Sequence, residues 1–411
     1  MRFKLLFVLV LLAAKSFSQQ KDLQYYMQKA ATNSPLLTDY NNQVKAASID
    51  SLLSRATYKP QVLGNLNASY APVINGFGYD TALSNGQVLS ALVGVNKKIF
   101  GKSQINSQAV SYLRTRESLI IKKKIAAKDL NKAIILQYIT AWGTSEELRY
   151  SEKNAVLLND EDLILKKLTR NSIYKQTDYL IFDATVKQQS IATLQLKQQY
   201  QNDLAMLNYL SGDTDTTLVS LPKPNITIKS IVDGQQIFIH QFAADSLKIL
   251  SDNKLINNNY KPSLSLLADA GYNSTFVHDA YKNFGFSVGM GMTIPIYDGH
   301  QRNLQLQKSN TALETVRAYK SNYERQQAQQ IYMLNLKLRQ FEETAAALES
   351  QLIISEALIE ANRKLLLTGD AQITEYIIAL SNFVTIQSGL SKNNVSRLQI
   401  INELNYWKSN D

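Results

Sequence analysis

Few side chains in this sequence could carry catalytic or metal-binding chemistry. The three histidines, His240, His278 and His300, lie far apart, and none has a spacing typical of metal ligands. The acidic pairs Glu146-Glu147 and Glu342-Glu343 have basic neighbours and are expected on solvated faces of long helices. The chain has no cysteine, and it contains no nucleophile elbow, phosphate loop or dinucleotide fingerprint. These features argue against an enzyme and predict no cofactor and no metal.

The stretch from Asn283 to Arg302 predicts a strand, a turn and the start of a very long helix. Its side chains alternate strictly between a large apolar face and a small or polar face. The apolar face consists of Phe284, Phe286, Val288, Met290, Met292, Ile294 and Ile296. An exposed strand this apolar must be covered by a core, a partner or lipid. The small opposite face is typical of a water-filled barrel lumen, so we expect Phe286, Val288, Met290 and Met292 to face lipid.

The same plan occurs twice along the chain. Thr177-Asp178-Tyr179 corresponds to Thr374-Glu375-Tyr376, and Leu207-Asn208-Tyr209 corresponds to Leu404-Asn405-Tyr406 at the same offset. Matches that keep one register indicate two tandem copies of a structural unit. We therefore predict a first repeat at 19–210, a linker at 211–235 and a second repeat at 236–408.

Proline and glycine positions predict the helices within each repeat. Short helices are expected at 22–31, 35–57 and 237–259, and two very long proline-free helices from Lys102 to about Leu168 and from Arg302 to about Leu367. An amphipathic hairpin precedes each long helix, with strands near 61–70, 89–95, 263–273 and 283–296. The apolar spacing of the second long helix is typical of a coiled coil. Between the repeats, a short extended piece is expected at 226–228.

Residues 1–18 are predicted to be a secretory signal peptide. Arg2 and Lys4 precede an apolar run from Leu5 to Ala14, and small residues stand just before Gln19. The run is shorter than the roughly 20 residues that span a bilayer. Cleavage there would remove three basic residues and lower the formal net charge from +10 to +7. The remaining surplus is spread along the predicted helices, which does not favour nucleic-acid binding.

These motifs resemble the TolC family of bacterial outer membrane efflux proteins. Tyr-Lys-Pro stands before both hairpins, at 58–60 and 260–262, and Pro-Ile-Tyr-Asp-Gly follows the last strand at 295–299. The first copy has Ile99-Phe100-Gly101-Lys102 in place of that turn. The resemblance implies a homotrimer in which four strands per chain make one 12-stranded β-barrel in the outer membrane. It further implies a helical tunnel through the periplasm, a periplasmic adaptor and an inner-membrane transporter as partners.

The predicted fold is thus mainly α-helical, with a tandem-repeat coiled-coil barrel and a membrane β-barrel part. Independently of the resemblance, four strands cannot close a barrel, which takes about eight, so the chain must oligomerise. The implied function is the outer membrane exit duct of a tripartite efflux or type I secretion system, which conducts substrates passively. The alternative is a soluble periplasmic coiled-coil adaptor or scaffold, and the amphipathic hairpins favour the channel. The sequence does not select among drugs, metal ions, dyes and polypeptides as substrates.

Two polar breaks, Asn171 to Asp178 and Gly369 to Glu375, join each long helix to a returning helix. In a trimer we expect them to form the periplasmic aperture. Glu375 would bring three carboxylates together, with Asp178 as its counterpart in the first copy, and would favour cation binding or pairing with Arg170 of a neighbouring hairpin. The alternative is that Glu375 only begins the return helix, where it interacts with the positive end of the helix dipole.

Overall fold

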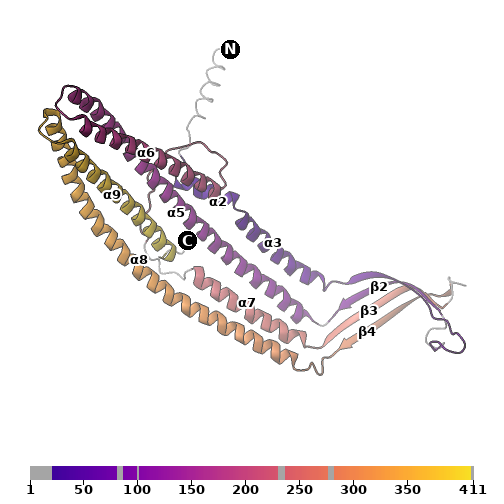
Figure 1. Cartoon of the computed structure of the whole chain (residues 1–411). Coiled ribbons are helices and arrows are strands. Elements are labelled where there is room, and N and C mark those ends of the chain that lie inside the picture. The colour runs from indigo at the N-terminus through magenta and orange to yellow at the C-terminus, as the bar shows by residue number, and fades with distance from the viewer. Residues whose placement is uncertain (1–20, 81–86, 100, 230–236, 276–281, 409–411) are drawn as a thin grey trace, which may run out of the picture. The chain divides into compact units, whose positions relative to one another are not determined.

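The computed structural model describes residues 21–80, 87–99, 101–229, 237–275 and 282–408. The predicted signal peptide lies outside them. The elements (Figure 1) follow in the order α2 (Leu23–Asn33), α3 (Pro35–Ala56), β1 (Gln61–Tyr70), β2 (Gln87–Lys98), α5 (Lys102–Arg170), α6 (Gln176–Ser211), α7 (Ile237–Asn259), β3 (Ser263–Ser274), β4 (Phe284–Thr293), α8 (Gln301–Thr368) and α9 (Ile373–Lys408). The mainly helical prediction with four strands is confirmed.

The chain divides into two compact units, each built from segments of both predicted repeats. One contains residues 1–37, 125–234 and 324–411, and we call it the helical unit. The other contains residues 38–124 and 235–323, and we call it the sheet unit. The long helices α5 and α8 contribute a segment to each unit.

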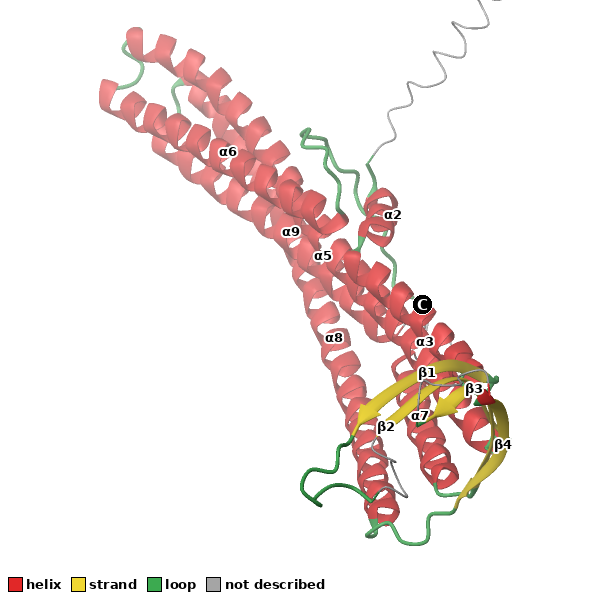
Figure 2. Ribbon diagram, turned by 90° about the vertical axis from the view of Figure 1, so that its right-hand side faces the viewer, coloured by secondary structure: helices red, strands yellow, loops and turns green. Residues whose placement is uncertain are grey.

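The sheet unit contains one antiparallel sheet in the order β1-β2-β3-β4 (Figure 2). The register pairs Val62 with Val95, Val95 with Ala268, and Ala268 with Val288. Gly271 is needed where β3 meets β2, because a Cβ at its φ of +151° would lie 2.1 Å from the Ala91 carbonyl oxygen. Both edge strands, β1 and β4, lack a second neighbour within the described part of the chain.

The last strand is shorter than the sequence alternation predicts. We expected alternation through Ile296, but β4 ends at Thr293. Pro295 has no N–H to donate to a strand neighbour, so pairing cannot continue through it. The turn that follows is built around Asp298, whose carboxylate accepts the backbone N–H groups of His300 at 2.9 Å and Arg302 at 2.8 Å. The Pro-Ile-Tyr-Asp-Gly motif therefore ends the strand and caps α8.

Hydrogen bonds between polar side chains join the helices of the sheet unit. Ser118 on α5 donates to Asp245 on α7 at 2.8 Å, and Ser111 donates to Asp252 at 2.5 Å. On the other side of α5, the Ser51 hydroxyl of α3 donates to the Ala109 carbonyl. Small residues at these contacts allow the helices to approach closely enough for such short side chains to reach across.

In the helical unit, α6 and α9 run back alongside α5 and α8 (Figure 1). One hydrophobic cluster gathers α2, α5 and α6 around Tyr26, Tyr138 and Leu207, and a second surrounds Leu165 and Tyr376 at the far ends of the long helices. Leu334 and Leu338, from the predicted coiled-coil spacing, pack against α9 in a third cluster. The apolar periodicity of α8 thus faces a helix partner, as predicted.

Residues 212–229 cross the helical unit without regular secondary structure. Residues 226–228, where the sequence predicts a short extended piece, form no strand, and a side chain bonds the backbone there. Asn405 donates to the Thr227 carbonyl and accepts from the Lys229 N–H, each at 2.8 Å. At the other end, Asn208 donates to the Asp215 carbonyl at 2.7 Å. Tyr138 donates to the Pro222 carbonyl between them at 2.8 Å.

Candidate functional site: the apolar sheet face and the helix tips

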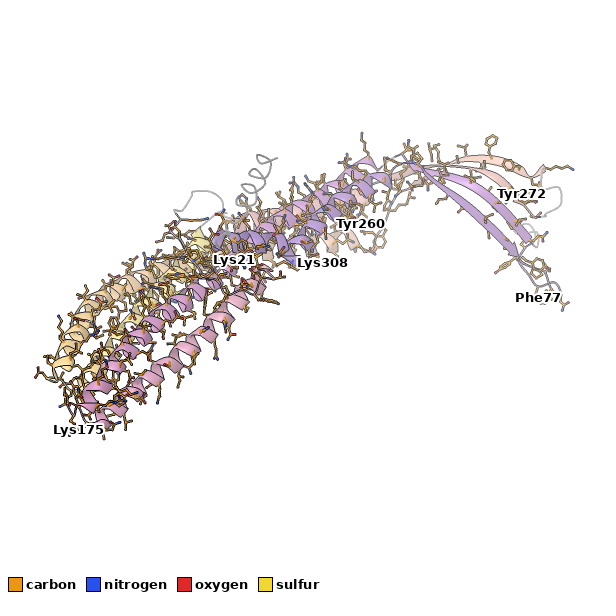
Figure 3. The ribbon with its side chains drawn as sticks, turned by 90° about the horizontal axis from the view of Figure 1, so that it is seen from above. Lys21, Phe77, Lys175, Tyr260, Tyr272 and Lys308 are labelled. Atoms are coloured by element: carbon orange, nitrogen blue, oxygen red, sulfur yellow. The ribbon has the colours of Figure 1, made fainter. Side chains whose placement is uncertain are left out.

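One face of the sheet carries apolar side chains across all four strands. Directly paired residues on neighbouring strands point to the same face, so the register aligns the apolar set of each strand. The face contains Val62, Leu66, Ala91, Val93, Val95, Ala268, Ala270, Tyr272, Phe286, Val288 and Met290. Phe286 is 84% exposed and Met290 is 74% exposed in the single chain. Tyr272 (Figure 3) belongs to the same face on β3. A continuous apolar surface this exposed needs a cover from outside the chain.

The opposite face of the sheet is more polar. Ser287 on β4 donates a hydrogen bond to Asp269 on β3 at 2.7 Å, and the row continues to Gly94 on β2. A single carboxylate with hydroxyl and glycine neighbours suits contact with water. The face is not wholly polar, because Leu63, Val88, Leu92 and Leu267 also lie on it. The sequence indicated Leu63 as an exception, and the register adds Val88, Leu92 and Leu267.

The predicted aperture residues lie where the two long helices turn back. Lys175 (Figure 3) lies in the turn between α5 and α6, and Asp178 is in the first turn of α6. Glu375 is exposed in the first turn of α9. Both acidic residues therefore occupy the position in which a carboxylate interacts with the positive end of a helix dipole. Among the described residues Arg170 forms no ion pair with either of them within one chain, and the predicted pairing concerned a neighbouring hairpin.

A tyrosine that the sequence did not single out joins the two tips. The Tyr174 hydroxyl lies 2.7 Å from the Leu366 carbonyl oxygen and 3.1 Å from the Ala371 carbonyl oxygen. Leu366 ends the buried face of α8, and Ala371 precedes α9. The turn of the first repeat is thus hydrogen-bonded to both ends of the turn of the second repeat.

An ion pair between a buried carboxylate and a partly exposed arginine lies within the long helices, near their tips. Glu161 on α5 is fully buried, and Arg363 on α8 donates to it at 2.5 Å. Hydrogen bonding to Glu161 raises the pKa of the Arg363 guanidinium. Beside the pair, burial raises the pKa of Tyr376 to about 12. The pair connects α5 of the first repeat to α8 of the second. The predicted aperture would have to open close to this connection.

The sequence contains a signal for Glu161 that the prediction did not use. Leu158, Glu161 and Leu165 follow the three-four spacing of one helix face, and the two leucines are almost completely buried. A carboxylate on such a face must find a cationic or hydrogen-bonding partner. No comparable signal exists for Tyr174, because its contacts depend on how the two turns meet.

The described residues contain no cluster of metal-ligating side chains. Within them, no group of three or more histidine and acidic side chains is placed to hold a metal ion. None of the helices in these ranges combines the length and the apolar character needed to cross a membrane.

The fold is similar to that of solved outer membrane channels. CusC, described as forming a transmembrane channel, matches with a TM-score of 0.77 and 12% identity over 96% of this chain and 93% of that chain. The outer membrane protein VceC from Vibrio cholerae matches with a TM-score of 0.76 and 13% identity over 94% and 95% of the two chains. The Campylobacter jejuni CmeC outer membrane channel matches with a TM-score of 0.75 and 12% identity over 94% and 85%.

No protein-family model and no curated protein matches the sequence. The structural matches nevertheless extend over nearly the whole chain, through both the strands and the long helices. The chain therefore has the fold of these outer membrane channels, which agrees with the four strands and long helices that the sequence predicts.

Proposed function

We propose that this protein is the outer membrane exit duct of a tripartite efflux or type I secretion system. The observation that carries the proposal is the sheet, which has an apolar face across four strands and two edge strands without a second neighbour in the described part of the chain. Lipid is the cover that suits such a face when the opposite face is polar. The likeness to solved outer membrane channels supports the same conclusion.

A ring of identical chains would satisfy both edges of the sheet. In an antiparallel sheet of four strands, β1 and β4 run in opposite directions. The β4 edge of one copy can therefore pair antiparallel with the β1 edge of the next, which is a head-to-tail contact that closes into a ring. Three copies supply a 12-stranded barrel, which exceeds the minimum of about eight strands. We propose this homotrimer, with the long helices as a tunnel in the periplasm.

The duct is passive in this proposal and depends on partners for energy. An inner-membrane transporter would drive the substrate, and a periplasmic adaptor would connect the transporter to the helix tips. The turns that contain Asp178 and Glu375 form the periplasmic aperture, with Arg170 of a neighbouring hairpin as a candidate partner for the carboxylates. The predicted signal peptide would direct the chain to the periplasm and so to the outer membrane.

Extraction and conductance test the proposal together. The expected result is that the protein is found in the outer membrane fraction, leaves it only with detergent, runs as a trimer in native mass spectrometry, and conducts ions in planar bilayers. A soluble adaptor, the alternative function, would be released by osmotic shock without detergent and would produce no channels. Release by osmotic shock together with silent bilayers would overturn the proposed function.

A further inference from the structure

A small cavity in the helical unit contains a carboxylate without a partner in the described part of the chain. The cavity lies among α5, α6 and α9 (Figure 2), and its volume is about 120 Å³. Its lining combines one carboxylate, Glu147, with hydroxyl and amide side chains, and Tyr150, Leu196 and Val384 provide an apolar part. No basic side chain is among the described residues that line it. We call it the Glu147 cavity.

Glu147 is half-buried and has no ion pair to offset that burial. Among the residues that the structure describes, its carboxylate accepts no hydrogen bond and lies in no ion pair, whereas the neighbouring Arg149 is paired with Glu146 at 2.6 Å. Burial raises the pKa of Glu147, and the charge of the exposed Lys392 offsets only part of that rise. A carboxylate that is partly removed from water without a partner is stabilised by a cation that enters beside it.

Hydrogen bonds hold the polar walls of the cavity without using this carboxylate. Asn154 on α5 donates to Gln387 on α9 at 3.2 Å. Gln189 on α6 donates to the Ser151 hydroxyl of α5 at 2.8 Å, and that hydroxyl lies 2.8 Å from the hydroxyl of Thr193. All three helices are therefore joined around the cavity, and the carboxylate remains available to a ligand.

The second repeat packs the equivalent helix pair with a leucine. The offset between the two Leu-Asn-Tyr motifs pairs Ser151 with Leu348, and it pairs Ala192 of the cavity with Gly389. The Leu348 side chain lies 3.7 Å from the point where a Cβ on Gly389 would stand. Thr344 occupies the position of the carboxylate. Packing of this helix pair therefore requires neither the small serine nor the acidic side chain.

We propose that the Glu147 cavity binds a small organic ammonium ion. The ammonium group would contact the Glu147 carboxylate, and a short alkyl chain would lie against Leu196 and Val384. The volume is several times the roughly 30 Å³ of a water molecule and below the roughly 300 Å³ at which drug-sized sites begin, so the ligand has few carbon atoms. A calcium ion fits poorly, because it takes about six to eight oxygen ligands and would leave the apolar lining unused.

Saturation-transfer NMR measures weak binding of this kind, because the ligand exchanges rapidly with the protein. The full-length protein in nonionic detergent is titrated at neutral pH with butylammonium and, separately, with the uncharged butanol. The signal of protein-free micelles is subtracted. Equimolar potassium chloride is then added as a competitor, which distinguishes an organic ammonium ion from an inorganic cation.

The expected result is saturable binding of butylammonium, with butanol bound about tenfold more weakly or less. Glu147→Gln keeps the size of the side chain and removes its charge, so it should weaken butylammonium binding about tenfold or more. Lys392→Gln should strengthen binding, because it removes the nearby positive charge. Glu152→Gln, at an exposed position of the same helix, is the matched control and should leave the affinity unchanged.

Four results would overturn the inference. Equal binding of butanol would show an apolar cavity that does not recognise charge. An unchanged affinity in the Glu147→Gln variant would place the ligand elsewhere. Displacement of half the butylammonium by equimolar potassium would show a general cation site. The absence of saturable binding would show that the assembled protein closes the cavity. Bilayer conductance of the same preparation reports the channel function separately, since binding here does not depend on it.

Discussion

Asn208 and Asn405 occupy the same position in the two Leu-Asn-Tyr motifs, and they hold opposite ends of the linker between the repeats. Asn208 donates to the Asp215 carbonyl at 2.7 Å, and Asn405 donates to the Thr227 carbonyl at 2.8 Å. The leucine before each asparagine is completely buried. In each copy of the motif the leucine packs in the core and the asparagine side chain holds the linker backbone by a hydrogen bond. We call these two asparagine contacts the linker clamp.

Removing the clamp should loosen the linker, more strongly at its second end. Asn405→Ala removes one donor and one acceptor, since Asn405 also accepts the Lys229 N–H. We expect it to cost about 1–3 kcal/mol of stability. Hydrogen exchange should increase at residues 225–229. Asn362→Ala is the control, because within the described ranges the Asn362 amide bonds to the Leu358 carbonyl of its own helix and to no other group. Equal effects of the two substitutions would contradict the clamp.

The two faces of β4 should respond differently to the same charge. Met290→Arg puts a charge on the proposed lipid face and should cost about 2–4 kcal/mol if it lies near the bilayer midplane. Gly289→Arg puts the charge on the opposite face and should change conductance while the trimer still forms. Trimer yield on native gels and single-channel currents measure the two effects. An equal loss of folded trimer from both variants would show that the faces are not distinguished.

The ion pair between Glu161 and Arg363 should hold the tips together. Arg363→Met leaves a fully buried carboxylate without its cation, and because Arg363 is itself 37% exposed we expect a loss of about 3 kcal/mol, the lower end of the range for buried pairs. The double variant Glu161→Leu with Arg363→Met removes both charges and should recover most of that loss. Urea denaturation of the single and double variants measures the difference. A double variant no more stable than Arg363→Met would rule out an uncompensated charge as the cause.

The sequence predicted the elements better than the contacts between them. Gly101 placed the start of α5 at Lys102, and the polar break from Thr169 to Gln176 placed its end within two residues of Arg170, because local sequence decides helix limits. The linker clamp could not be predicted, since the partners of Asn405 depend on the path of a segment without regular structure. The predicted β4 extended beyond Thr293 because the prediction used only the alternation of apolar residues. That alternation does not show that Pro295 lacks the N–H needed for strand pairing.

The ion pairs of Lys21 with Asp213 and Asp215 should make stability depend on pH. The Lys21 ammonium lies 2.9 Å from carboxylate oxygens of both Asp213 and Asp215, and Tyr25 donates to Asp213. Burial alone would lower the pKa of Lys21, but the hydrogen bonds to Asp215 and Asp213 outweigh it and raise that pKa above 10.5. The hydrogen bond from Lys21 lowers the pKa of Asp215 below 3.8.

The directions of the two pKa shifts define the pH range in which these ion pairs stabilise the protein. The lowered carboxylate pKa contributes stability above pH 3.8, and that contribution is lost as the pH falls toward the folded value. The raised pKa of Lys21 contributes below pH 10.5 and is lost as the pH rises through the folded value. The melting temperatures of the wild type and of Lys21→Gln should therefore differ by a constant amount between about pH 5 and 9. A difference that stays the same at about pH 2 would contradict this assignment.

The last prediction separates an aperture from a helix cap at Glu375. As a cap, the carboxylate interacts only with the first turn of its own helix, so Glu375→Ala should lower the melting temperature and leave the currents unchanged. As part of an aperture, three copies of Glu375 would lie near the axis of the proposed trimer. Their mutual repulsion would then favour cations, and Glu375→Ala should change conductance or cation selectivity with little effect on stability.

Asp178 supplies the matched variant, because it stands in the first turn of α6 as Glu375 stands in the first turn of α9. Single-channel currents in planar bilayers are compared for Glu375→Ala, Asp178→Ala and the double change. If the six turns of a trimer close one opening, the double variant should differ from the wild type more than either single variant. Unchanged currents with lower melting temperatures in all three variants would assign both carboxylates to their helix ends, and the constriction would then have to depend on other residues of the turns.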